Sequence, residues 1–251
     1  MRKKKTPNME ECRSLPAPPL LDEEVSSEKK KKKKWVNPHK REFGIEIVKK
    51  KGVTSRNILH KISIDIGYVT SGLTHYDIKQ KVVKSLYYKK DSEVLVKGAG
   101  IVYLTNLCKE TLAKYREIVL HEIDEEELEF TQFILEEPLV IAGQKSFSIS
   151  LYVLLHYLIT KLLYDFNCHS VVLVRPGSAK KLLGVKSNVK MKDSYKTAWI
   201  KENLPEWETK NNHTADSNFS MILTNYDELS ELYPNVKLLN KVDYKIYESY
   251  L

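Results

Sequence analysis

Short apolar and alternating segments in the first half of the chain predict three consecutive β-strands, over residues 58–66, 71–79 and 82–89. The links between them are only a few residues long. Because such short links join neighbouring strands that run in opposite directions, we expect an antiparallel three-stranded unit.

The pattern then changes to helices that alternate with single strands. Apolar residues recur at helical spacing over 101–118, and a long apolar stretch at 147–166 predicts a buried helix. Strands are expected at 130–135 and 170–174, and helices at 193–204 and 214–223, with a short covering helix around Leu229, Leu232 and Tyr233. Strands separated by helices favour parallel β-α-β units, so the fold class is α/β with a mixed sheet covered by helices.

Residues 1–57 differ from the rest of the chain in composition. They contain 17 Lys and Arg against 8 Asp and Glu, whereas residues 58–251 are close to neutral. Six lysines stand together at 29–34. A segment of this kind buries too little apolar surface to offset its ordering entropy, so we expect a disordered basic arm over 1–57 and a folded domain over 58–251. The arm's lysines suit an import signal or a phosphate-binding tail, and a plain solvated extension is an equal alternative.

Cysteine usage and hydropathy set limits on the class of protein. The three cysteines, Cys12, Cys108 and Cys168, are far apart and form no C-x-x-C pair, so neither a disulfide framework nor a zinc cluster is indicated. A reduced intracellular setting is expected, and a nuclear or viral replication site is compatible with the lysine block. The apolar run at 147–164 is interrupted by His156 and Lys161, so a membrane span is not expected.

Acidic residues occur where predicted elements begin or end. Asp65 ends the first strand two residues before Gly67, Glu136 follows the strand at 130–135, and His213 and Asp216 open a late helix. Residues three apart on a helix share a face, so His213 and Asp216 point the same way. Carboxylates are the ligands that magnesium prefers, and three of them brought together are able to build a two-metal nuclease site.

The order of these motifs resembles the RNase H-like nuclease superfamily, and within it the RuvC-type Holliday junction resolvases, including their poxvirus-type and mitochondrial branches. The resemblance covers about residues 58–226. It comprises the first-strand Asp-x-Gly of Asp65 and Gly67, Glu136 at the end of the fourth strand, His213-x-x-Asp216, and a basic segment that begins at Arg175. Ile66 stands where the family has proline.

The resemblance implies an RNase H-like mixed five-stranded sheet and a metal-dependent endonuclease of DNA recombination and repair that acts as a homodimer on branched DNA. It implies two Mg²⁺ ions per site, replaceable by Mn²⁺, held by Asp65, Glu136 and Asp216, with His213 as a further catalytic residue. The implied DNA-binding residues are basic: Arg175, Lys180, Lys181, Lys190 and Lys192.

Several alternatives stay open at this point. Glu137 competes with Glu136 as the ligand, although the apolar run leads directly into Glu136. Asp65 alone is also typical of a turn, and His213 of a residue that caps or packs a helix. The function alternatives are an RNase H-like nuclease on RNA or linear DNA, or a non-catalytic domain that binds nucleic acid.

Overall fold

The computed structural model describes residues 44–52, 57–68, 70–89, 101–138, 147–175, 177–184, 193–234, 242 and 244–251. The chain divides into two units, 1–40 and 41–251, and the description below concerns the second. The expected arm up to residue 43 and two of the expected DNA-binding residues, Lys190 and Lys192, lie outside the described residues.

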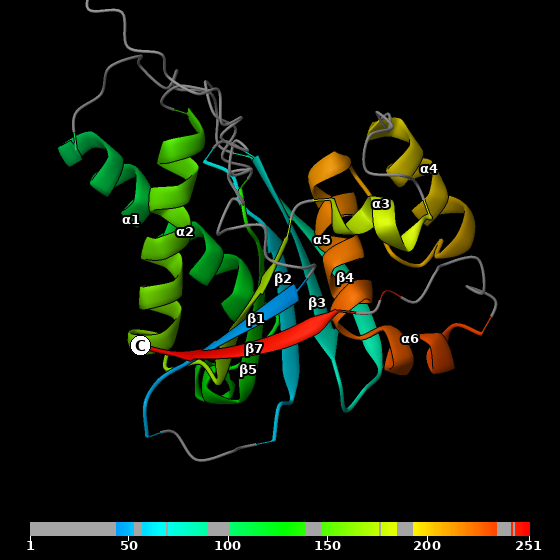
Figure 1. The fold of residues 1–251 in the computed structure, drawn as a ribbon, viewed down its shortest axis with the longest axis horizontal. Helices are drawn as coiled ribbons and strands as arrows, with labels where there is room; N and C mark the ends of the chain where they lie inside the picture. Colours follow the sequence, from blue (N-terminus) through cyan, green and yellow to red (C-terminus); the bar gives the residue numbers. More distant parts are fainter. Residues whose placement is uncertain are drawn as a thin grey trace, which may run out of the picture. The chain divides into compact units, whose positions relative to one another are not determined.

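Seven strands form one mixed sheet, in the order β4-β3-β2-β5-β6-β1-β7 (Figure 1). The three strands β2, β3 and β4 pair antiparallel, and β5 and β6 continue the sheet parallel to β2. Beyond β6, β1 runs antiparallel to β6, and β7 runs parallel to β1. The strands are β1 (Gly44–Lys49), β2 (His60–Asp65), β3 (Thr70–Asp77), β4 (Val82–Lys89), β5 (Thr131–Glu136), β6 (Ser170–Val174) and β7 (Lys245–Tyr250).

Helices cover both faces of the sheet and enclose two apolar layers (Figure 1). On one face, α1 and α2 pack on Ile62, Leu73 and Phe133. On the other face, α4, α5 and α6 pack on Tyr76, Ile134 and Val172. The helices are α1 (Ile101–Leu120), the 3₁₀ turn η1 (Glu125–Phe130), α2 (Phe147–Tyr164), α3 (Ser178–Leu182), α4 (Asp193–Asn203), α5 (Asn212–Thr224) and α6 (Tyr226–Leu232).

The mixed α/β sheet covered by helices is confirmed, with two more strands than the five expected. The strand predicted at 82–89 and the strand at 170–174 have the observed bounds, and the other long elements differ by a few residues at their ends. The short helix expected near Leu229 is α6, and Leu229 is its buried residue.

The expected boundary at residue 58 has to be corrected. Gly44–Lys49, assigned from the sequence to a disordered arm, form β1 inside the sheet. Ile45 and Val48 are both buried, each in a different apolar layer. Lysines directly after this strand concealed its short apolar pattern among the charged residues of the arm.

The long helix α2 is the buried helix expected from its composition. Leu154, Leu158 and Leu162 are fully buried against the sheet, whereas Tyr152 and Tyr164 are exposed on the outer face. Within the described part of the chain, no helix combines the length and the apolar character needed to span a membrane. Cys108 and Cys168 are buried free thiols.

His60 and His75 form a buried pair at the end of the sheet where η1 leads into β5. His60 Nδ1 lies 3.1 Å from His75 Nε2, and the other ring nitrogen of His60 lies 3.2 Å from Glu127. Glu122 approaches His75 at 4.0 Å and also accepts a hydrogen bond from Lys84. Burial, and then the neighbouring His60, lower the pKa of His75 to about 4, against the smaller opposing effects of Glu122 and Asp77.

We predict that deleting residues 1–43 leaves the fold intact, whereas deleting residues 1–57 destabilises it. The longer deletion removes β1, exposes the edge of β6 and leaves β7 without its partner. Ile45 and Val48 alone contribute roughly 3–5 kcal/mol of burial free energy. Urea unfolding of the two truncated proteins measures the difference. Equal midpoints would show that β1 contributes little.

We also predict that stability falls as the pH is lowered from about 6.5 to 4. The unfolded chain takes up a proton on His75 over this range before the folded chain does, so the folded state is progressively disfavoured, by up to about 3 kcal/mol. Replacing His75→Gln should reduce this loss, as measured by urea midpoints across the range. The exposed His121→Gln is the matched control, and an equal slope in all three proteins would contradict the assignment.

Candidate active site

Strand alternation places Asp65 and Glu136 on the same face of the sheet. In β2, Ile62 and Ile64 pack toward α1 and α2, so Asp65 points to the opposite face, where α5 lies. In β5, Ile134 packs toward α5, and Glu136, two residues further on, shares that face. Because β2 and β5 are parallel neighbours, their carboxyl ends meet at one edge, and both carboxylates lie there.

Helix α5 reaches this edge because Gly72 has no side chain. Gly72 pairs with Asp65 across β2 and β3. A Cβ atom on Gly72 would lie 2.1 Å from the carbonyl carbon of His213 and 2.2 Å from the nitrogen of Thr214. These atoms are backbone, so the first turn of α5 lies directly on the strand. The close approach brings the start of α5 beside Asp65.

Local hydrogen bonds fix where α5 starts and how it lies on the sheet. The Asn211 side chain accepts from the Thr214 N–H, and the Thr214 hydroxyl lies 3.1 Å from the Asn211 nitrogen, which forms a capping box. Further along, Thr74 of β3 donates to Asn218 and contacts Ser217 in a buried polar seam. The helix therefore begins two residues earlier than expected, and the cap is Asn211 rather than His213.

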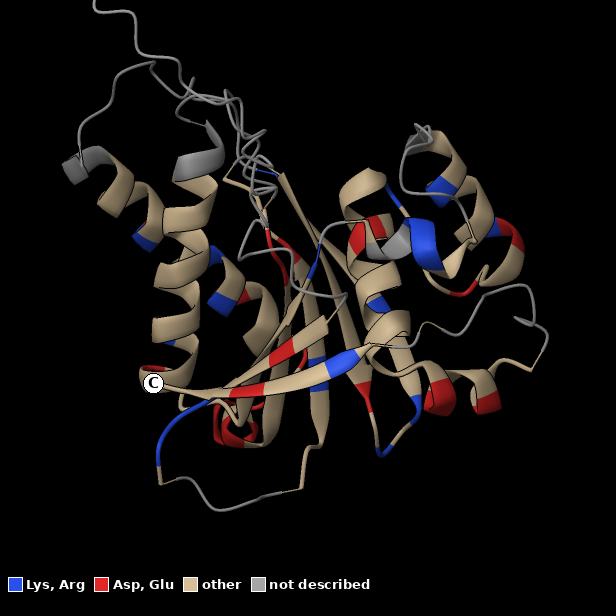
Figure 2. Cartoon of the chain, in the orientation of Figure 1, with Lys and Arg blue, Asp and Glu red and all other residues tan. Residues whose placement is uncertain are grey.

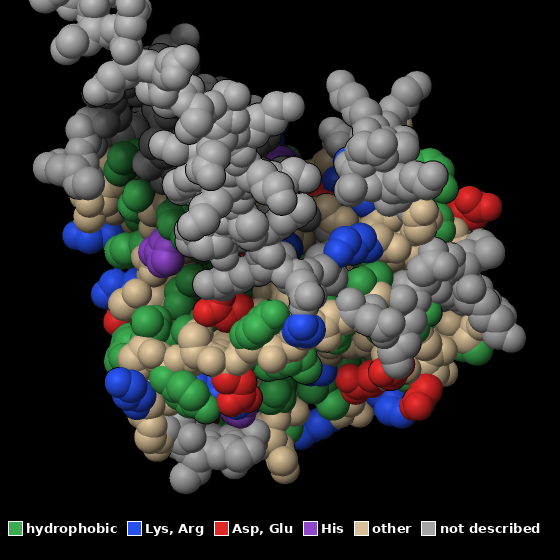
Figure 3. All heavy atoms as spheres, in the orientation of Figure 1, with side chains coloured by type: hydrophobic (Ala, Val, Ile, Leu, Met, Phe, Trp, Pro, Cys, Tyr) green, Lys and Arg blue, Asp and Glu red, His purple; other side chains and the backbone are tan. Residues whose placement is uncertain are grey.

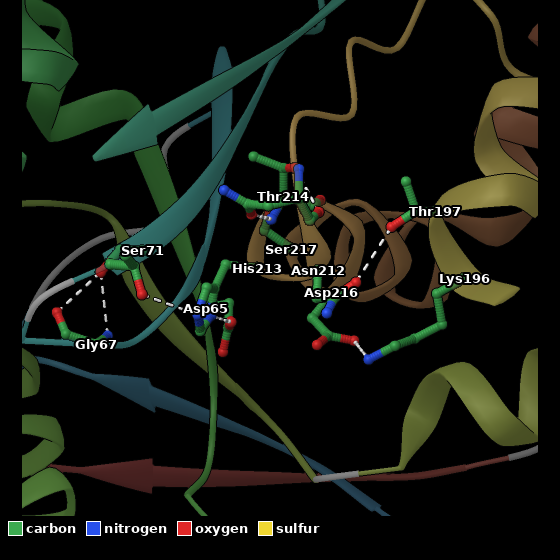
Figure 4. Close-up of polar contacts among 12 residues, drawn as sticks. Asp65, Gly67, Ser71, Lys196, Thr197, Asn212, His213, Thr214, Asp216 and Ser217 are labelled. Carbon is green, nitrogen blue, oxygen red and sulfur yellow. Dashed lines mark hydrogen bonds and ion pairs between the residues drawn. The ribbon is translucent and has the colours of Figure 1, made fainter. Parts of the chain in front are cut away.

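His213 bridges β2 and β3 through both ring nitrogens. Its Nδ1 lies 2.5 Å from Asp65 Oδ2 (Figure 4), and its Nε2 lies 2.9 Å from Thr70 Oγ1. The hydrogen bond to Asp65 raises the pKa of His213, against the opposing effect of burial. A protonated ring would neutralise Asp65, and the half-exposed ring is accessible to solvent.

Asp216 lies one turn further along α5 and forms an ion pair with Lys196 of α4 (Figure 4). Burial raises the pKa of Asp216 to about 6, even though the ammonium of Lys196 favours the ionised form. The negative charge of Asp65 acts in the same direction as burial. Asp216 is thus close enough to Asp65 for the charge of Asp65 to disfavour ionisation of Asp216.

The negative charge of Glu136 is less well balanced by neighbouring groups than the charges of Asp65 and Asp216. Burial raises its pKa well above the usual value, and the charges of Asp65 and Asp216 raise it further. Lys196 and a hydrogen bond from the backbone N–H of Gly177 oppose this shift. The effects of Asp65 and Asp216 on the pKa of Glu136 indicate that the three carboxylates lie near one another.

Glu137 faces another part of the molecule. Its backbone N–H donates to Val174, and its side chain lines a small hollow beside Glu46, Arg175 and Tyr247. Successive strand residues point to opposite faces, which separates Glu137 from Glu136. The structure therefore brings Glu136, and not Glu137, to Asp65 and Asp216.

The three carboxylates fit a hard divalent cation by charge and donor type, although they do not form a closed set of ligands. Within the described ranges, no three acidic, imidazole or thiol groups are gathered tightly enough for a ready-made metal site. His213 and Lys196 instead hold two of the acids. Burial, and then the charges of Asp65 and Asp216, raise the pKa of Glu136, and an oxygen-seeking cation such as Mg²⁺ would offset the repulsion among the three carboxylates.

Basic residues lie next to this edge. Arg175 follows β6, and Lys180 and Lys181 belong to α3, which packs beside α5 (Figure 2). Partial burial and the nearby charge of Arg175 lower the pKa of Lys181, which indicates that these two cations are close neighbours. The acidic run around η1 precedes β5, at the opposite end of that strand from Glu136. Elsewhere the view in Figure 3 shows acidic and basic side chains interspersed among apolar ones.

Sequence reasoning missed four contributors to the site. Lys196, Thr70, Gly72 and Gly177 carry no local signal, because each acts on a residue remote in the chain. Besides the apolar run that leads into Glu136, strand alternation separates Glu136 from Glu137, because Ile134 and Glu136 are two residues apart and lie on the same face of the sheet.

No protein-family model and no curated protein matches the chain. Among solved structures, the chain is similar to Thermus thermophilus RuvC in complex with a Holliday junction substrate, with a TM-score of 0.44 and 14% identity over 72% of this chain and 98% of that one. A second similarity is to the Aquifex aeolicus Ppx/GppA phosphatase, with a TM-score of 0.28 and 18% identity over 50% of this chain and 40% of that one.

We predict that Gly72→Ala displaces the first turn of α5 and separates His213 from Asp65. The added methyl group meets backbone atoms that cannot rotate away, so we expect a loss of roughly 1–3 kcal/mol in stability. Chemical unfolding measures the loss, and NMR of the His213 ring measures the separation. Gly52→Ala is the control for backbone strain without a clash: a Cβ atom there meets nothing within 4 Å, but Gly52 has a positive φ, so this variant should lose stability without moving the His213 resonance. An unchanged His213 resonance in Gly72→Ala would contradict the prediction.

Proposed function

We propose that this chain is a metal-dependent endonuclease that cuts four-way DNA junctions. The observation that carries the proposal is the convergence of Asp65, Glu136, Asp216 and His213 from β2, β5 and α5 at one edge of the sheet. These residues are remote in sequence, and a purely structural role would not require three mutually repelling carboxylates in one space. The sequence motifs that resemble the RuvC-type resolvases include these same four residues.

Asp65, Glu136 and Asp216 would hold the metal. When bound there, Mg²⁺ would stabilise the extra negative charge that develops on a phosphodiester during hydrolysis and would favour formation of hydroxide from water. Asp65 lies between the two other elements, since β2 is flanked by β5 in the sheet and by α5 above it. It is therefore the candidate for a carboxylate shared by two ions, with Glu136 and Asp216 on either side.

His213 would hold or move a proton at Nε2. Its Nδ1 is fixed by Asp65, which sets the orientation of the ring, and Nε2 faces the Thr70 hydroxyl, which can donate or accept. The raised pKa favours the protonated ring, which suits proton transfer to a reacting oxygen.

Arg175, Lys180 and Lys181 would bind the DNA backbone beside the site. Contacts from lysine and arginine to phosphates orient a duplex without reading its sequence, which suits an enzyme that recognises a branched shape. Lys190 and Lys192 stay part of this prediction, although they lie outside the described residues.

A homodimer would place two such sites at a fixed separation, as paired cuts across a junction require. The exposed side chains of Tyr152, Val153 and Tyr164 on the outer face of α2 support a role for that helix in the dimer contact.

Asp65→Asn is expected to reduce Mg²⁺-dependent cleavage of a four-way junction by at least roughly a hundredfold, the order of magnitude lost with one positioned catalytic group. Binding to the junction should persist, because the phosphate-binding residues are unchanged. Labelled junctions, gel-shift binding and single-turnover cleavage measure both quantities. Glu137→Gln is the matched control, because this acid lies nearby and faces away from the site.

The substrate panel separates the alternatives. Linear duplex DNA, an RNA–DNA hybrid and the junction should be tested under the same conditions, and faster cleavage of either of the first two would favour a different nuclease of this type. Junction binding with no cleavage by the unmodified chain would favour a non-catalytic domain. Full cleavage by Asp65→Asn would remove Asp65 from the mechanism.

A further inference from the structure

Lys196 brings a positive charge into this group of acidic residues. It extends from α4, its side chain is only 11% exposed, and its ammonium contacts Asp216 Oδ1 (Figure 4). Lysine is rarely this buried unless it is paired with an acid. Here the pairing partner is one of the three carboxylates that would hold the metal.

The influence of Lys196 extends beyond this ion pair. Its positive charge favours the ionised forms of both Asp216 and Glu136, and it disfavours protonation of His213. A single ammonium therefore interacts with three of the four residues proposed to act in catalysis. This is the electrostatic position that a bound cation would take.

We propose that Lys196 is the resident cation of the metal-free site and competes with a divalent ion for Asp216. The proposal rests on the proposed function, since it concerns the same carboxylates. The Oδ1 atom of Asp216 cannot receive a close metal ion while it carries the ammonium, because two cations on one oxygen repel each other. Metal binding at this oxygen thus requires the Lys196 ammonium to withdraw.

If Lys196 competes with the metal, removing its charge should change fold stability and metal affinity in opposite directions. Without metal, removal of the Lys196 charge leaves Asp216 partly buried and uncompensated, which destabilises the fold. With metal, the same change frees a ligand and strengthens binding. If Lys196 only supported the structure, removing its charge would lower both the stability of the fold and the affinity for metal. A rise in metal affinity therefore distinguishes a competing cation from a structural contact.

The first experiment measures Mn²⁺ affinity of the full chain without DNA, by isothermal titration calorimetry and by electron paramagnetic resonance of free Mn²⁺. Lys196→Met, which keeps the length of the side chain without its charge, is expected to bind Mn²⁺ roughly tenfold more tightly, as expected for removal of one nearby like charge. Lys196→Arg should restore the affinity of the unmodified chain. Lys201→Met, at an exposed position on the same helix, is the matched control.

The second experiment needs no substitution and so does not depend on whether a variant folds. An amine-reactive acetylating reagent is applied to the unmodified chain with and without Mg²⁺, and modification is measured by peptide mass spectrometry. The paired ammonium should react slowly without metal and several-fold faster with it. Lys201 should react equally in both conditions.

The outcomes separate this inference from the proposed function. Equal or weaker Mn²⁺ binding by Lys196→Met, or metal-independent modification of Lys196, would overturn the competition and leave the nuclease proposal standing. An absence of Mn²⁺ binding in the unmodified chain and in Lys196→Met alike would overturn both. Tighter binding by Lys196→Met together with metal-dependent exposure of Lys196 would support the competition even if the preferred nucleic acid is not a junction.

Discussion

The direct contact between the backbone of α5 and the backbone of β3 at Gly72 is the constraint on which the candidate site depends. The sheet by itself brings together only Asp65 and Glu136, on adjacent parallel strands. The third acid and the histidine come from a helix, and their distance from Asp65 is set by how closely that helix lies on β3. The buried seam of Thr74, Ser217 and Asn218 then prevents the helix from sliding along the strand.

Electrostatics within the site are only partly balanced by the protein itself. His213 contacts Asp65, and Lys196 forms an ion pair with Asp216. Glu136 accepts a hydrogen bond from the Gly177 N–H and is affected by the charge of Lys196. Stability alone would favour replacing such an arrangement by apolar side chains of similar volume. Its presence is therefore better explained by chemistry at this edge of the sheet than by folding.

Much of this arrangement was accessible from the sequence because it follows from local patterns. Apolar alternation located β2, β4, β5 and β6, and the positions of Asp65 and Glu136 at strand ends follow from the same pattern. The contribution of Lys196 was not accessible, because the ion pair joins α4 to α5 through tertiary packing.

The terminal strands escaped prediction for a different reason. β7 is exposed along nearly its whole length and lacks the apolar alternation that marks a half-buried strand. Strand β1 was not recognised because its few apolar residues are followed by lysines, and its place in the sheet is set by pairing with β6.

The placement of β1 has a consequence for how the domain is synthesised. Ile45 pairs with Val174, and Gly44 with Lys245, so the earliest strand finds its neighbours only after most of the chain has left the ribosome. Contacts between such distant residues close large loops and slow folding. Until then, the exposed backbone edge of a nascent β1 is able to pair with other chains, so a chaperone that covers this edge would improve the yield of folded protein.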